Sequence, residues 1–207
     1  PFSSLVKLPD YPEALEVTEE EYQRNREIFA WLTEECDKRG IWVVLKFYNI
    51  HIPYPFAVKH NLELLQSSIN PLVADYTYKS IVEFVKSYPH IGLMVCLGEA
   101  LRGNQNKTRW FVETILPAVK QGVAEAGLKE EPPVILRGHD CDPIDAINQA
   151  TRIYGNLYTQ WKYNGESLTT YFLRGKWKRI HQELSALGTT HIMNVHILAD
   201  LEPFRFN

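Results

Sequence analysis

The sequence predicts a parallel α/β fold, and within that class a (β/α)8 TIM barrel that is present here as a partial segment. Helical and strand-like segments alternate strictly along the 207 residues. The strand-like segments are short apolar runs, which is typical of strands covered on both faces. No glycine-rich phosphate motif follows any of them, which disfavours a nucleotide-binding doubly wound sheet.

Five predicted strands and 207 residues are too few for a complete barrel of about 250 residues. We therefore expect residues 1–207 to be the central part of one catalytic barrel domain. The remaining strands, and further domains, would belong to other parts of a longer chain. The opening residues lack a Met, a basic segment and an apolar segment, so we expect the start to have been cut or processed.

The first elements are predicted as follows. Residues 1–17 contain three prolines and no sustained period, which indicates an irregular lead-in. Thr18 and Glu21 have the spacing of a capping box, so a helix begins there and ends at Gly40. The β-branched, apolar segment 41–47 is a strand, and residues 53–71 form a loop with several prolines.

The same alternation continues to the end of the chain. Strands are predicted from Ile91 to Gly98 and over 132–139, 156–163 and 191–197. Helices are predicted over 76–88, 106–128, 143–153 and 177–187, and Pro117 should bend the second of these.

Composition excludes several classes of function. The net charge is −3 and no basic block is present, so nucleic acid is not an expected partner. No apolar run has the length of a membrane span. Cys36, Cys96 and Cys141 are odd in number and lack CxxC spacing, which argues against a disulfide framework and a zinc site.

Polar side chains follow all five predicted strands. In a barrel the C-terminal strand ends carry the chemistry, so these side chains are candidates for one site, although wet loops are also polar. The set comprises Lys46, Asn49, His51, Glu99, Arg102, Arg137, His139, Asp140, Asp142, Trp161, Lys162, Tyr163, Glu166, Asn194, His196 and Glu202.

Glu99 and Glu166 are the catalytic candidates. Glycoside hydrolysis uses two carboxyl groups that flank the scissile bond. Each glutamate directly follows a glycine, which lets the backbone present the acid in an unusual conformation. The alternative is a pair of ordinary loop acids, with Glu99 capping a helix or pairing with Arg102.

Basic and aromatic side chains suggest the kind of ligand. Lys46, Arg102, Arg137 and Lys162 come from four strand ends, and arginine binds planar carboxylates through two hydrogen bonds. An acidic sugar is therefore a natural ligand, with Trp161 or Tyr163 stacking on its ring. Equally, these cations could pair with the acids nearby.

The segment 138–142 is also a candidate metal site, because His139 and the aspartates Asp140 and Asp142 could be ligands. Metal-dependent hydrolase barrels typically use a His-x-His strand motif, and Asn194-Val-His196 offers only one imidazole. We therefore expect neither a metal nor a cofactor. His139 and Asp140 fit better as contacts to substrate hydroxyls or as groups that orient a carboxyl.

Four motifs together resemble a known enzyme family. They are Cys96-Leu-Gly-Glu99-Ala-Leu-Arg102, Leu136-Arg-Gly-His139-Asp-Cys-Asp142, Lys162-Tyr-Asn-Gly-Glu166-Ser-Leu-Thr-Thr-Tyr171 and Asn194-Val-His196-Ile-Leu-Ala-Asp-Leu-Glu202-Pro-Phe-Arg205. They resemble the barrel of the glycoside hydrolase clan that uses two glutamates, and in particular the bacterial exo-α-galacturonidase family that acts on rhamnogalacturonan II.

The resemblance implies a retaining enzyme that releases terminal galacturonic acid, with Glu99 as acid/base and Glu166 as nucleophile. It implies a periplasmic or extracellular, multidomain protein. The substrate-binding candidates are Lys46, Arg102, Arg137, His139, Asp140, Trp161, Lys162, Tyr163 and His196. One departure is that the two glutamates end strands two apart, where the clan pattern has three.

Other functions stay open at this point. An inverting hydrolase similar to α-glucuronidases would use Asp140 or Asp142 to activate water. A sugar-binding barrel without catalysis would use the same strand ends, and a metal-dependent lyase or aldolase would use the segment 138–142.

Overall fold

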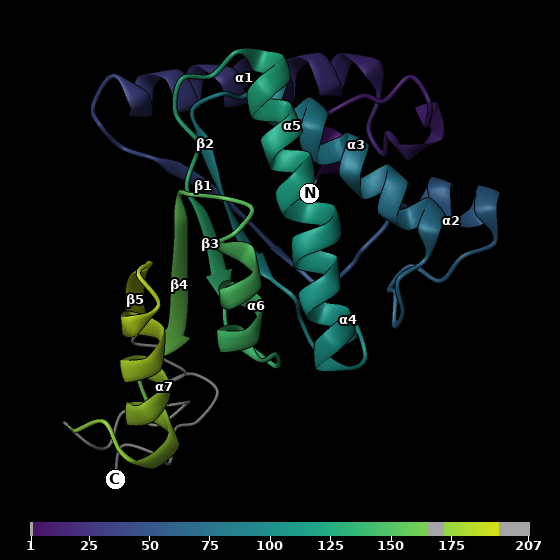
Figure 1. The fold of residues 1–207 in the computed structure, drawn as a ribbon. Helices are drawn as coiled ribbons and strands as arrows, with labels where there is room; N and C mark the ends of the chain where they lie inside the picture. Colours follow the sequence, from purple (N-terminus) through teal and green to yellow (C-terminus); the bar gives the residue numbers. More distant parts are fainter. Residues whose placement is uncertain (1, 165–171, 195–207) are drawn as a thin grey trace, which may run out of the picture.

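Five parallel strands form the centre of the structure, a computed structural model that describes residues 2–164 and 172–194 (Figure 1). They are β1 (Val43–Tyr48), β2 (Ile91–Cys96), β3 (Val134–Arg137), β4 (Leu157–Lys162) and β5 (Thr190–Asn194). Their order in the sheet is their order in the sequence, and each pairs in parallel with the next. The predicted alternation of helix and parallel strand is therefore confirmed.

Helices connect the strands. Before β1 come η1 (Phe2–Ser4), η2 (Pro12–Ala14) and α1 (Glu19–Asp37), and between β1 and β2 come α2 (Tyr54–His60) and α3 (Pro71–Ser87). α4 (Asn104–Arg109), the π-helical η3 (Trp110–Ile115) and α5 (Leu116–Ala126) lead to β3. α6 (Pro143–Ala150) precedes β4, and α7 (Gly175–Ala186) precedes β5.

The prediction of a (β/α)8 TIM barrel, complete or partial, is wrong for this chain. The described residues form a small α/β domain with an open sheet, whose edge strands β1 and β5 each pair with one neighbour. The alternation of helix and strand specifies parallel connections between successive strands. It does not specify closure, which requires the two edges to be paired as well.

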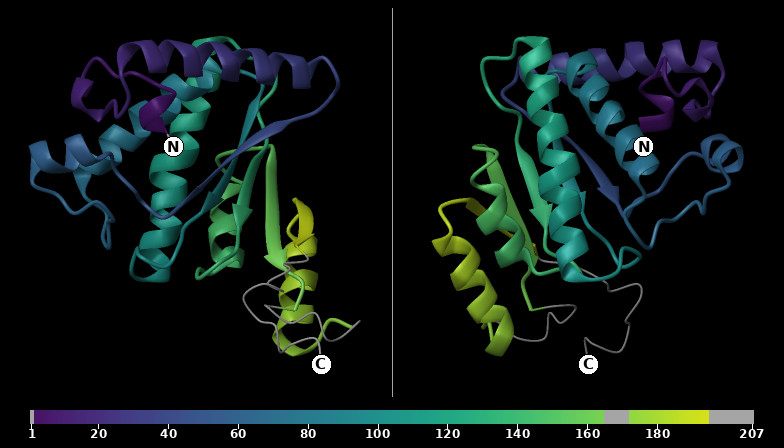
Figure 2. Two further views of the ribbon diagram at one scale, coloured as in Figure 1. Left: turned by 180° about the vertical axis from the view of Figure 1, so that it is seen from behind. Right: turned by 45° about the vertical axis from the view of Figure 1, so that its right-hand side comes forward.

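The buried core lies between the sheet and the long helices. Leu93 and Val95 of β2 and Leu136 of β3 point to this side and are almost fully buried. α3 and α5 pack against each other there, as both views in Figure 2 show. A Cβ at Gly122 would lie 2.7 Å from Cβ of Val85, so a glycine is needed for this close approach.

The opposite face of the sheet is more polar. Side chains alternate between the faces of a strand, so Lys46 and Tyr48 of β1 share the face opposite the core. The strand register places Tyr48, Cys96, Arg137 and Gln160 in one row across four strands. This row ends at the C-terminal edge of the sheet, beside the loops that carry the candidate site.

Helix boundaries differ from the predictions in instructive ways. Thr18 caps α1 as predicted, since its Oγ1 accepts a hydrogen bond from Glu21 N at 3.2 Å. α3 begins earlier than predicted because Asn70 caps it and Pro71 occupies its first position. α2 replaces part of the predicted loop, because its prolines lie at the start of a helix. Pro117 lies in the first turn of α5, directly after the π-helical stretch η3. Prolines and π-helical stretches are both common where helices bend.

Candidate active site

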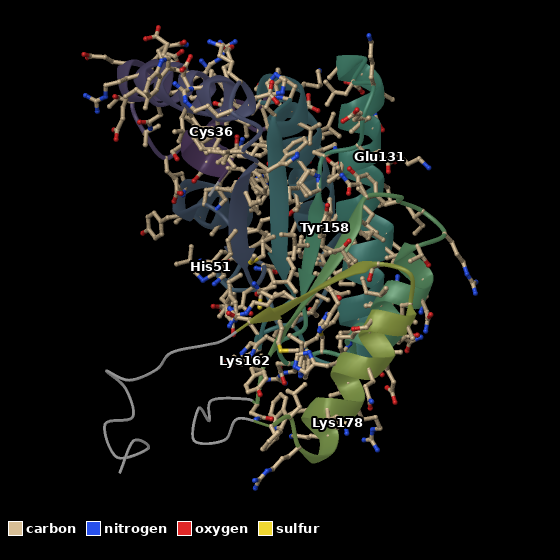
Figure 3. All side chains as sticks on the ribbon, turned by 90° about the vertical axis from the view of Figure 1, so that its left-hand side faces the viewer. Cys36, His51, Glu131, Tyr158, Lys162 and Lys178 are labelled. Carbon is tan, nitrogen blue, oxygen red and sulfur yellow. The ribbon has the colours of Figure 1, made fainter. Side chains whose placement is uncertain are left out.

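The C-terminal ends of the strands lie at one edge of the sheet. Figure 3 shows His51 and Lys162 at this edge, whereas Cys36 and Glu131 lie at the opposite end. Since all five strands are parallel, the residues that follow them are brought to the same side. This edge is where open parallel sheets bind their ligands.

Glu99 and His139 are in direct contact at this edge. Glu99 follows β2 and His139 follows β3, and His139 Nε2 donates a hydrogen bond to Glu99 Oε1 over 2.8 Å. This hydrogen bond lowers the pKa of Glu99, and the nearby charge of His139 adds to the effect. The Glu99 side chain is 65% exposed, so its carboxylate remains accessible to a ligand.

Tyr48 is a second partner of Glu99. It ends β1 and hydrogen-bonds to the Glu99 carboxylate, which also lowers the pKa of Glu99. Burial raises the pKa of Tyr48 to about 12, and the charge of Glu99 contributes to this rise. The phenol therefore remains a neutral donor, and Glu99 accepts hydrogen bonds from Tyr48 and His139, whose ring centroids are 5.9 Å apart.

The backbone on both sides of Glu99 is held by Asn49. Its Oδ1 accepts a hydrogen bond from Ala100 N at 3.1 Å, and its own main-chain N donates to Cys96 O at 3.2 Å. A Cβ at Gly98 would lie only 1.7 Å from Asn49 Oδ1, and Gly98 has a φ of +77°. Glycine is therefore required by both space and conformation, as the Gly98–Glu99 pattern suggested.

The loop that carries His139 is held by Lys107 of α4. Lys107 Nζ donates to Asp140 Oδ2 over 2.7 Å and to the main-chain oxygen of the same residue. Lys107 is only 4% exposed, and Asp140 adopts a left-handed φ of 50°. A buried charge requires a close partner, so this ion pair fixes the turn directly after His139.

Three of the predicted cations have no acidic partner within the described part of the chain. No ion pair there joins Lys46, Arg102 or Arg137 to Glu99, Asp140 or Asp142. Arg137 lies in the row of Tyr48, and Lys46 is one row further back on the same face. Arg102 is exposed on the loop after Glu99, where its main-chain N donates to Ser67 O.

Trp161 and Lys162 end β4 beside a cleft of about 430 Å3. Its lining residues are Asn104, Gly138, His139, Asp140, Cys141, Trp161, Lys162, Lys176 and Trp177. A Cβ at Gly138 would lie 2.3 Å from the Trp161 ring, and the Trp161 and Trp177 ring centroids are 5.8 Å apart. Trp161 is therefore packed between Gly138 and Trp177, next to the contact between His139 and Glu99.

The remaining candidates are placed as follows. Asp142 caps α6, because its Oδ1 accepts hydrogen bonds from the main-chain N of Ile144 and Asp145, each at 3.1 Å. Tyr163 follows β4 and its main-chain N donates to Asn194 O at 2.9 Å. Glu166, His196 and Glu202 lie outside the described residues.

Sequence reasoning misses the supporting roles of Tyr48 and Lys107. In the sequence, Tyr48 is an ordinary residue at the end of a predicted strand. Lys107 lies in α4, in which Thr108 is also buried. A lysine at a helix position that faces the core is the available signal, since lysine is almost never fully buried without a partner.

The described residues contain no cluster of three or more His, Cys, Asp or Glu side chains that could hold a metal. Among the helices described here, none combines the length and apolar character needed to cross a membrane.

Comparison with known proteins shows what this chain is similar to. No family model matches the chain, and no curated protein matches it. A solved structure described as a GH138 enzyme targeting pectin rhamnogalacturonan II is 51% identical over 97% of this chain, with a TM-score of 0.92. The chain spans 29% of the length of that protein.

Proposed function

We propose that this chain is part of a glycoside hydrolase that acts on the pectic polysaccharide rhamnogalacturonan II. The observation that carries the proposal is the accessible Glu99 carboxylate, held by His139 and Tyr48 at the C-terminal edge of a parallel sheet. The similarity to a GH138 enzyme, at 51% identity over almost all of this chain, supports the same class of reaction. We further propose that the released sugar is a terminal α-linked galacturonic acid.

The proposed mechanism is a double displacement with retention. Glu99 would protonate the glycosidic oxygen while Glu166 attacks the anomeric carbon and forms a glycosyl-enzyme intermediate. Glu99 would then remove a proton from the water that releases the sugar. Retention requires the two carboxyl groups to lie about 5–5.5 Å apart, across the scissile bond.

The free site favours the base form of Glu99. Its pKa is lowered mainly by the hydrogen bond from His139, which suits the second step, in which Glu99 accepts a proton. The first step needs a protonated Glu99. We propose that bound substrate supplies this change, because the glycosidic oxygen would replace His139 as the partner of Oε1 and the sugar would exclude water.

Recognition of an acidic sugar is assigned to the cations near Glu99. Arg137 is partly buried in the row that contains Tyr48, where its guanidinium could bind a carboxylate through two hydrogen bonds. Lys46 and Arg102 would add positive charge around it, and Lys162 would contribute from the end of β4. Arg137, Lys46 and Arg102 have no acidic partner within the described residues, which supports this assignment.

The structural tasks of the other acids disfavour an inverting mechanism that uses Asp140 or Asp142. Asp140 is paired with Lys107, and Asp142 caps α6. We also propose that the functional protein includes further domains and works outside the cytoplasm, as expected for an enzyme whose substrate is a plant polysaccharide.

The proposed role of Glu99 is tested with the full-length protein and two substrates. The Glu99→Gln variant should lose most of its activity on an α-galacturonide with a poor leaving group, because protonation is then essential. It should lose much less on an activated aryl galacturonide, whose leaving group needs no proton. Equal losses on both substrates would contradict the acid/base role, and Glu113→Gln on the exposed surface of η3 is the control.

A further inference from the structure

Three side chains form a hydrogen-bonded chain behind the end of β4. Thr159 Oγ1 lies 2.7 Å from His191 Nδ1, and His191 Nε2 lies 2.6 Å from His181 Nδ1. His181 Nε2 lies 3.1 Å from both the Lys162 and the Tyr163 main-chain oxygens. The chain thus joins β4, β5 and α7, and none of its members is a candidate in the sequence.

When both rings are neutral, the direction of every hydrogen bond in this chain is fixed. A carbonyl oxygen only accepts, so His181 Nε2 carries a hydrogen. In a neutral ring His181 Nδ1 is then an acceptor, which requires His191 Nε2 to donate. His191 Nδ1 is consequently an acceptor, and the Thr159 hydroxyl donates to it.

The surroundings favour a neutral His191. Thr159 is 1% exposed and His181 is 3% exposed. Burial lowers the pKa of His191 to about 4, and the neighbouring His181 contributes to the decrease. With both rings neutral, this pattern gives all four ring nitrogens and the Thr159 hydroxyl a hydrogen-bond partner.

Further hydrogen bonds hold the residues at the end of β4. Asn164 is buried, its Nδ2 donates to Phe172 O at 3.0 Å, and its Oδ1 accepts from Arg174 N at 3.3 Å. Tyr163 N also donates to Asn194 O at 2.9 Å. The main chain at 162–164 is therefore fixed by β5, by α7 and by the residues that precede α7.

We infer that the Thr159–His191–His181 chain positions the C-terminal end of β4 for catalysis, through the hydrogen bonds from His181 to two main-chain carbonyls. This inference rests on the proposed function. Lys162 is a proposed substrate contact, and Glu166 follows Asn164 by two residues in the sequence. His181 is a positioning residue, because it acts through the main chain and not on the substrate.

Two substitutions at His181 separate positioning from packing. In His181→Gln the side-chain amide reaches the position of Nε2 and can still donate to the carbonyls. In His181→Asn the amide oxygen reaches only the position of Nδ1, so the hydrogen bond from His191 can be kept while the carbonyls lose their donor. Gln182→Ala, at an exposed position on α7, is the control.

The expected result is a loss of kcat without a matching change in KM. With the full-length enzyme and a galacturonide substrate, His181→Asn should lower kcat by about 10- to 100-fold, as expected for a small displacement of reacting groups. His181→Gln should keep kcat within about threefold of wild type. Equal losses in both variants, or wild-type kcat in His181→Asn, would overturn the inference.

Hydrogen exchange gives a readout that does not depend on turnover. The amide of Tyr163 should exchange faster in His181→Asn than in the wild type, and close to the wild-type rate in His181→Gln. Unchanged exchange in His181→Asn would overturn the inference. A wild-type protein that releases no sugar would contradict the proposed function instead, and the exchange rates would still decide whether His181 holds the end of β4.

Discussion

His139 Nε2 lies 2.8 Å from Glu99 Oε1, although the two residues are 40 positions apart in the sequence. Parallel pairing of β2 with β3 brings them together, since each follows the C-terminal end of its strand. The contact has a chemical consequence, because a hydrogen bond to the charged form of a carboxyl lowers its pKa. The proton affinity of Glu99 is thus lowered mainly by His139.

Substitution of His139 should shift the pH dependence of activity. His139→Asn removes the donor, so the pKa of Glu99 should rise toward its ordinary value of about 4.3. A general acid works in its protonated form, so the alkaline limb of the profile of kcat/KM should move to higher pH. His139→Gln keeps a neutral donor at the position of Nε2 and should shift the limb less.

The same profile identifies the role of Glu99. A shift confined to the acid limb would mean that Glu99 works in its ionised form, as a nucleophile. That result would contradict the assignment of acid/base to Glu99 and would suggest that Glu99 and Glu166 exchange roles.

Substitution of Gly98 should disturb the site through the backbone. In Gly98→Ala the new methyl group would overlap Asn49 Oδ1, and the φ of +77° is unfavourable for alanine. We expect a loss of about 1–3 kcal/mol in the free energy of unfolding, measured by urea denaturation, together with lower kcat. Gly127→Ala is the matched control, since its φ is +64° but no atom lies within 4 Å of the new Cβ.

The two glycine substitutions should differ in their effect on activity. Gly127→Ala should cost about 1 kcal/mol and leave kcat unchanged, because only backbone strain is involved. Equal effects of both substitutions on kcat would show that the contact between Gly98 and Asn49 does not position Glu99.

Removal of the Lys107 charge should loosen the turn after His139. Lys107→Met keeps much of the buried volume but removes both hydrogen bonds to Asp140. Because the Asp140 side chain is 54% exposed and can be solvated, we expect a modest loss of about 1–2 kcal/mol in stability. Lys120→Met, at an exposed site, should change stability little, and crystal structures would show whether His139 keeps its contact with Glu99.

Arg137 should determine the preference for an acidic sugar. Arg137→Gln should raise KM for a galacturonide by about tenfold or more, since one charge-assisted hydrogen bond contributes roughly 1.5–3 kcal/mol. The effect on the corresponding neutral galactoside should be small. Similar increases for both sugars would remove Arg137 from carboxylate recognition, and Arg152→Gln, at an exposed position, serves as the control.

Local patterns predict most of the secondary structure. The apolar run from Ile91 and the capping box at Thr18 both correspond to observed elements, β2 and α1. α2 escapes prediction because Pro53 and Pro55 suggest a loop, whereas proline is also favourable in the first turn of a helix. Closure into a barrel could not be inferred from alternation, because alternation describes neighbouring strands and not the two edges of a sheet.

The candidate site is predictable only in part. A glutamate after a strand and a glycine is recognisable from sequence, and so is the polar character of the strand ends. The contact of Glu99 with His139, the role of Tyr48 and the burial of Lys107 depend on which strands are neighbours and on how helices pack. Such relationships join residues from different elements, and a linear pattern does not contain them.

The most direct test of the account is proton NMR of rhamnogalacturonan II oligosaccharides incubated with the full-length protein and with its Glu99→Gln variant. The account predicts that the wild-type protein releases galacturonic acid, first seen as the α-anomer, and that the variant releases almost none. Absence of sugar release by the wild-type protein, or equal release by Glu99→Gln, would contradict it.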